Sequence, residues 1–127
     1  MAYVTNIKSI ANNTVYPLTI IDGENGVRIA IAGSGAWNGD LWVPWIGNQS
    51  EDYKAIKIIW GFDSEQVIYL YQDYWYPPHE NAVKYRTISP LVYYDGNNHI
   101  IPGNGTGGGN KGLILTGKGK DIELKMV

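Results

Sequence analysis

The chain contains no cysteine among its 127 residues. This absence excludes disulfide bonds, thiolate metal sites and a cysteine nucleophile, so the fold has to be stabilised by packing. Histidine is nearly absent as well, with two residues, and neither H-E-x-x-H nor a comparable metal-binding spacing occurs. We therefore expect no metal and no other cofactor.

Basic residues are few and scattered. The chain has 10 Lys and Arg against 12 Asp and Glu, a net charge of −2, and no basic run. Nucleic-acid binding needs a basic stripe that neutralises phosphates, so we expect no nucleic-acid partner. An apolar run of the roughly 20 residues that a membrane helix needs is also lacking, as is a signal peptide. These features predict a soluble protein that is cytoplasmic or secreted by a non-classical route.

Helical periodicity is missing too, and short β-prone runs separated by Gly, Asn, Asp and Pro take its place. The predicted strands cover residues 3–10, 16–21, 26–32, 41–46, 53–60, 66–72, 82–88, 91–94, 112–116 and 121–127. Residues 33–40 and the glycine-rich 103–112 are predicted to be irregular. The pattern predicts a single all-β domain over 1–127, an antiparallel β-sandwich or jelly roll, with a small β-barrel as the alternative.

Two of these runs alternate between apolar and polar residues. Within 54–60, the apolar residues Ile56, Ile58 and Trp60 fall on one face, and in 121–127 the apolar positions alternate with charged ones. This period of two is typical of a sheet with one wet face. In the strand 66–72, Tyr69 and Tyr71 are expected on the face opposite to the core.

Three of the five tryptophans lie between residues 37 and 45. Trp37 follows glycines and precedes Asn38 and Asp40, so we expect it to be exposed in a loop. Trp42 and Trp45 are expected to close one end of the core instead. An indole face packs on the apolar face of a sugar ring, while amide and carboxylate groups bond its hydroxyls. The mixture around Trp37 therefore favours carbohydrate binding.

Two further segments repeat this mixture of aromatic and polar residues. Residues 69–81 carry five aromatics followed by Pro77 and Pro78, and we select Asp73 and Trp75 from them as ligand contacts. Residues 93–99 combine two tyrosines with a polar turn that includes Asn97. A plain hairpin would explain this last segment alone, but the recurrence in three segments favours a binding surface.

The start of the chain resembles a known class of small protein. Asn6-Ile7 through Asn12-Asn13-Thr14, followed by Pro17-Leu18-Thr19-Ile20, is similar to the first hairpin of small microbial β-sandwich proteins. That class includes aegerolysin-like membrane-active proteins and several lectins. The resemblance covers the opening of the chain only and rests on strand and turn chemistry, so it assigns no site residues.

Together these observations predict a non-enzymatic, lectin-like protein whose partners are glycans or glycoconjugates. The predicted contacts are Trp37, Asn38, Asp40, Asp73, Trp75 and Asn97, and homo-oligomers would supply multivalency. One alternative is a membrane- or lipid-recognising protein or toxin component, with its aromatics at the lipid surface. Another is a self-assembling structural protein. No nucleophile elbow and no defined carboxylate pair supports an enzyme. The Asp- and Asn-rich segments 22–25 and 95–98 are interpreted as turns rather than calcium sites.

Overall fold

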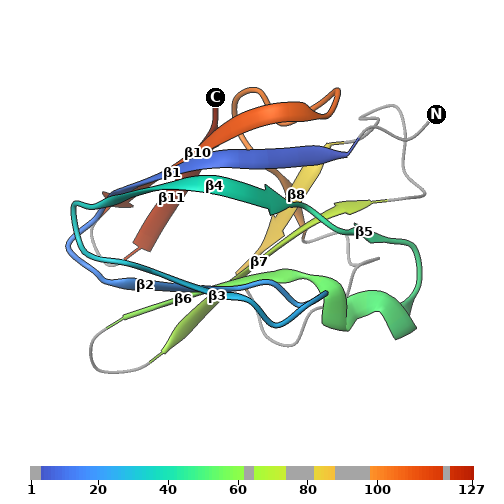
Figure 1. Cartoon of the computed structure of the whole chain (residues 1–127), viewed down its shortest axis with the longest axis horizontal. Coiled ribbons are helices and arrows are strands. Elements are labelled where there is room, and N and C mark those ends of the chain that lie inside the picture. Colours follow the sequence, from blue (N-terminus) through green and yellow to red (C-terminus); the bar gives the residue numbers. More distant parts are fainter. Residues whose placement is uncertain (1–3, 62–64, 74–81, 88–97, 119–120) are drawn as a thin grey trace.

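The computed structural model describes residues 4–61, 65–73, 82–87, 98–118 and 121–127, and the strands in these ranges form two facing sheets (Figure 1). The first sheet consists of β1 (Thr5–Asn13), β4 (Ala36–Trp42), β10 (Gly109–Lys118) and β11 (Asp121–Met126). Its strand order is β11-β10-β1-β4, and β1 is parallel to β10 but antiparallel to β4.

The second sheet consists of β2 (Leu18–Ile21), β3 (Arg28–Ile31), β5 (Trp45–Ile46), β6 (Ile56–Trp60), β7 (Gln66–Asp73), β8 (Val83–Arg86) and β9 (His99–Ile100). Its order is β3-β2-β6-β7-β8-β9, and the short β5 lies parallel to the end of β7. The neighbours along this order are antiparallel. The all-β prediction is confirmed, and the described strands form a sandwich of two sheets rather than one closed sheet.

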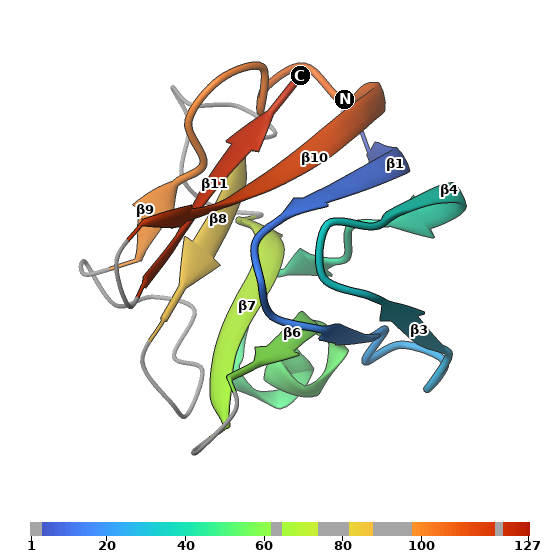
Figure 2. The same ribbon diagram turned by 90° about the vertical axis from the view of Figure 1, so that its left-hand side faces the viewer.

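Two of the connections that cross between the sheets, β1 to β2 and β3 to β4, lie next to each other (Figure 2). The buried Asn12 ties them together, because its amide donates to the carbonyls of Tyr16 at 2.8 Å and Ala32 at 3.0 Å. Its carbonyl accepts from the Thr14 backbone and hydroxyl. The Asn-Asn-Thr sequence at 12–14 is thus turn chemistry, as the pattern indicates.

The core fills the space between the sheets, and strand alternation decides which side chains enter it. Ile56, Ile58 and Trp60 of β6 are buried, and in β11 the apolar positions are buried while the charged ones are exposed. The predictions of which side chains in 54–60 and 121–127 face the core are therefore confirmed. The opposite face of the second sheet carries a smaller cluster in which Tyr69 and Tyr71 pack with Ile46 and Ala55.

A short 3₁₀ helix, η1 (Gln49–Lys54), joins β5 to β6 and lies beside β5 (Figure 1). It replaces the start of the strand predicted over 53–60. Within the described ranges, no helix is long and apolar enough to cross a membrane.

Two segments that were predicted to be irregular are partly strands. β4 covers 36–42 because it pairs with β1, and β10 begins at Gly109, inside the glycine-rich segment. Backbone pairing with the central β1 outweighs the low strand propensity of glycine at both places. The strand predicted over 91–94 lies outside the described residues.

Candidate functional site

A groove of about 620 Å³ opens at one end of the sandwich, where β4, β5 and η1 meet the turn between β2 and β3. We call it the Trp42 groove. Its apolar wall is formed by Val4, Trp42, Val43, Pro44 and Trp45. Its polar wall is formed by Glu24, Gly47, Asn48, Glu51 and Lys54. Concave sites that combine aromatic surface with a few polar groups are the usual form of small-ligand sites.

The apolar wall presents two indoles. Trp42, the last residue of β4, is 52% exposed, which is a large fraction for a tryptophan side chain. Trp45 in β5 is half-buried and lines the same groove. The exposed indole offers a flat apolar face to a ligand, and the half-buried one extends this surface inward.

The backbone between the two indoles is fixed to both sheets. The Val43 N–H donates to the Thr5 carbonyl at 2.9 Å, and the Pro44 carbonyl accepts from the Gln72 N–H at 2.8 Å. The buried Gln72 side chain in turn accepts from the Thr5 N–H at 2.9 Å. Because the segment is held at both sides, little backbone entropy would be lost when a ligand binds against it.

Glu51 organises the polar wall. Its Oε1 accepts from the Gly47 N–H at 3.1 Å and from Asn48 Nδ2 at 3.0 Å, and its Oε2 accepts from Lys54 Nζ at 2.7 Å. The Lys54 hydrogen bond, followed by that of Gly47, lowers the pKa of the Glu51 carboxyl, and the same contact raises the pKa of Lys54. Glu51 is therefore ionised, both of its carboxylate oxygens accept hydrogen bonds, and it positions Gly47, Asn48 and Lys54.

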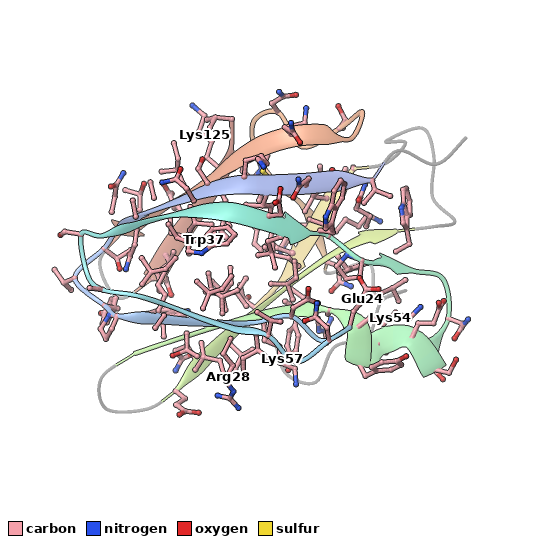
Figure 3. All side chains as sticks on the ribbon, in the orientation of Figure 1. Glu24, Arg28, Trp37, Lys54, Lys57 and Lys125 are labelled. Atoms are coloured by element: carbon pink, nitrogen blue, oxygen red, sulfur yellow. The ribbon has the colours of Figure 1, made fainter. Side chains whose placement is uncertain are left out.

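Glu24 reaches the groove from the turn between β2 and β3. Its backbone N–H donates to Asp22 Oδ1 at 2.9 Å, and Gly26 N–H donates to the Asp22 carbonyl at 2.7 Å. The turn packs closely on η1, since a Cβ added at Gly23 would lie 2.0 Å from the Tyr53 carbonyl oxygen. Figure 3 shows Glu24 beside Lys54, whose pKa the Glu24 charge also raises.

No protein-family model matches this chain, and no curated protein or solved structure is significantly similar to it. The function of the groove therefore has to be inferred from its own chemistry. Its walls supply an indole face, the acceptor oxygens of Glu24 and the remaining donor capacity of Lys54.

The three site residues predicted on β4 divide between its two faces. Trp37 is half-buried against the core and lies between the sheets in Figure 3, whereas Asn38 and Asp40 face outward. Asp40 accepts from Lys8 Nζ at 2.6 Å and from Asn6 Nδ2 at 2.9 Å, and these bonds lower the pKa of its carboxyl. The strand separates Trp37 from the two polar residues expected beside it.

The expected roles of the tryptophans in this segment are thus wrong in part. Trp37 was predicted to be exposed, but it covers Gly39, where an added Cβ would lie 2.5 Å from its Cζ2. Trp42 was predicted to close the core, but it falls at an exposed position of β4. The reason is that 36–42 is a strand, so its side chains alternate and cannot share one loop surface.

The remaining three predicted contacts lie in or next to residues that the structure does not describe. Asp73 is the last residue of β7 and its backbone pairs with Ile46, but its side chain is outside the described part. Trp75 and Asn97 lie wholly outside the described residues.

Sequence reasoning missed the polar wall of the groove. A usable signal was Asn48 followed three residues later by Glu51, a spacing similar to that of a capping box at a helix start. Here Glu51 accepts from the Asn48 side chain and the Gly47 backbone rather than from the Asn48 backbone. Glu24 was considered only as part of a turn, and no local pattern connects it with η1.

The turn that contains Glu24 shows ordinary turn chemistry. Asp22 Oδ1 accepts from the Glu24 N–H, and Asn25 Oδ1 accepts from the Val27 N–H at 2.9 Å. Among the residues that the structure describes, no group of three or more His, Asp or Glu could hold a metal ion. The hydrogen bonds accepted by Asp22 and Asn25 confirm the interpretation of this segment as a turn.

A second groove of about 320 Å³ opens at the other end of β6 and β7. It is lined by Trp60, by Asp121 of β11 and by the rings of Tyr85 and His99, whose centroids are 5.3 Å apart. Its tryptophan, Trp60, is 8% exposed and packs on Tyr16 with ring centroids 5.0 Å apart. The buried indole leaves little stacking surface, so we favour the Trp42 groove as the functional site.

A polar network lies below η1. Arg86 Nη1 donates to Asn98 Oδ1 at 2.9 Å, and Asn98 Nδ2 donates to the hydroxyl of the fully buried Tyr71 at 2.7 Å. The charge of Arg86 acts on Asp52, whose buried Oδ1 has no hydrogen-bond partner among the residues that the structure describes. Burial raises the pKa of Asp52, and the charge of Arg86 opposes this effect.

Asp52→Asn is expected to change how stability depends on pH. A carboxyl with a raised pKa in the folded state binds its proton more tightly there than in the unfolded chain, so the contribution of Asp52 to stability falls as pH rises above about 3.8. Asparagine does not titrate. Urea unfolding should therefore show that the free energy of unfolding of the variant, relative to that of the wild type, is higher at pH 7 than at pH 3.5. The exposed Asp121→Asn is the control, and an equal difference at both pH values for Asp52→Asn would contradict the burial effect.

Proposed function

We propose that this protein binds carbohydrate at the Trp42 groove and does not catalyse a reaction there. The observation that carries the proposal is the 52% exposed indole of Trp42, held on an anchored backbone opposite a polar wall. Sugar rings have apolar C–H faces and hydroxyl edges, and this groove offers a partner for each. Affinity for a single sugar should be modest, so multivalent glycans or oligomers of the protein would raise it.

The state of the carboxylates supports binding over glycoside hydrolysis. A glycosidase needs a carboxylic acid that keeps its proton near neutral pH, which requires a raised pKa. Hydrogen bonds from Lys54 and Gly47 lower the pKa of Glu51 instead, and both of its oxygens are occupied. The second carboxylate of the groove, Glu24, therefore has no protonated carboxylic acid beside it with which to form the acid–base pair of a glycosidase.

Trp42→Ala is expected to weaken binding of a sugar by about 30-fold, the effect of truncating a central aromatic contact of about 2 kcal/mol. A glycan array would identify a ligand, and isothermal titration with that ligand would measure the loss. Because Trp42 is exposed, its truncation should leave the free energy of unfolding within about 1 kcal/mol of the wild type.

Tyr53→Ala is the matched control, because Tyr53 is an aromatic that is 64% exposed on η1 but does not line the groove. It should bind the ligand as the wild type does. Wild-type affinity in a folded Trp42→Ala variant would place the site elsewhere. Binding to vesicles of bare phosphatidylcholine without any glycan would favour the lipid-recognising alternative, and large assemblies on a sizing column would favour the self-assembling one.

A further inference from the structure

The two carboxylates of the Trp42 groove are not equivalent. Glu51 has its oxygens occupied by Gly47, Asn48 and Lys54. The Glu24 carboxylate accepts no hydrogen bond and forms no ion pair with any residue that the structure describes. Glu24 therefore has both oxygens available to a ligand.

The charges of the groove-lining residues that the structure describes sum to −1. Its charged lining residues are Glu24, Glu51 and Lys54, and Lys54 forms its ion pair with Glu51. The uncompensated charge is therefore that of Glu24. The same groove contains the indoles of Trp42 and Trp45, whose faces attract cations. Negative charge and aromatic faces within one groove favour a ligand that carries positive charge and disfavour an acidic one.

We propose that the groove prefers glycans with free amino groups, that is amino sugars in their ammonium form, over N-acetylated, neutral and acidic sugars. This inference rests on the proposed sugar-binding function. The sugar ring would pack on Trp42, and its ammonium group would donate to Glu24. N-acetylation removes the charge and leaves the ring and most hydroxyls unchanged, so it isolates the contribution of Glu24.

The preference should be measured with a glucosamine tetrasaccharide, its N-acetylated form and a glucose tetrasaccharide of the same linkage. At about pH 6 an amine of this kind is protonated. We expect the amino form to bind about fivefold tighter than the other two, as an exposed ion pair combined with a cation–π contact allows. The advantage should shrink at high salt, because exposed charges are then screened.

Glu24→Gln should abolish this advantage, so that the three sugars bind the variant with affinities within about twofold of one another. Glu65→Gln removes an exposed carboxylate at the other end of the sandwich and should preserve the advantage. Equal binding of the three sugars to the wild type, or a preference that persists in Glu24→Gln, would overturn the inference but not the sugar site. Failure of all three sugars and of a glycan array would overturn the proposed function itself.

Discussion

Gly23→Ala is expected to destabilise the protein by about 3 kcal/mol and to weaken ligand binding at the Trp42 groove. The added Cβ would lie 2.0 Å from the Tyr53 carbonyl oxygen and 2.7 Å from backbone atoms of Lys54 and Ala55. These atoms belong to η1 and its C-terminal end, so the clash cannot be relieved by a side-chain rotation. The turn would have to move away from η1 and carry Glu24 with it. Urea unfolding and titration with a bound sugar measure the two effects.

Gly26→Ala is the matched control within the same turn. Gly26 has a φ of +75°, and no atom lies within 4 Å of an added Cβ. Its replacement should therefore cost only about 1 kcal/mol, the penalty of a left-handed backbone, and should preserve binding. Equal losses of stability in the two variants would show that the turn does not pack on η1 as described.

Asn12→Ala is expected to cost about 3 kcal/mol or more in the free energy of unfolding. The substitution removes four hydrogen bonds at a buried position, although the carbonyls of Tyr16 and Ala32 each keep one other donor, the Thr14 hydroxyl and the Gly35 N–H. These groups lie where the connections β1 to β2 and β3 to β4 cross between the sheets, so the loss would loosen the sandwich at these connections. Chemical denaturation of the variant tests the expectation.

Asn13→Ala provides the comparison, because the Asn13 side chain is exposed and has no hydrogen bond to any residue that the structure describes. Its replacement should change stability by less than about 0.5 kcal/mol. Asn12→Asp keeps the shape and the acceptors but removes both donated hydrogen bonds and buries a charge, so it should be at least as harmful as alanine. A tolerated Asn12→Asp would contradict the role of the amide donors.

The candidate site was predicted only in its chemistry. The sequence predicted a binding loop with Trp37, Asn38 and Asp40 and placed Trp42 and Trp45 at the end of the core, whereas the Trp42 groove is lined by Trp42 and Trp45 together with carboxylates and an amide. The individual residues differ because the segment was expected to be a loop. As a strand it sends Trp37 inward and Trp42 outward, and this outcome depends on pairing with β1, which precedes β4 in the sequence with two other strands between them.

The sequence by itself determined the class of fold and the faces of several strands. Period-two alternation and turn residues act over a few neighbouring residues, so Ile56, Ile58 and Trp60 could be placed in the core without knowledge of any partner strand. The same holds for the charged face of β11 and for the turn at Asp22. The sequence alone predicts these features because residues close to one another in the chain determine them.

Only the tertiary structure decided which aromatic is available to a ligand and which charges accompany it. Glu24 and Lys54 are thirty residues apart in the sequence, and they meet because Gly23 lets the turn between β2 and β3 approach η1. Trp42 joins them because β4 ends at the same end of the sandwich. Long-range backbone contacts bring these segments together, and the sequence pattern within each segment does not predict these contacts.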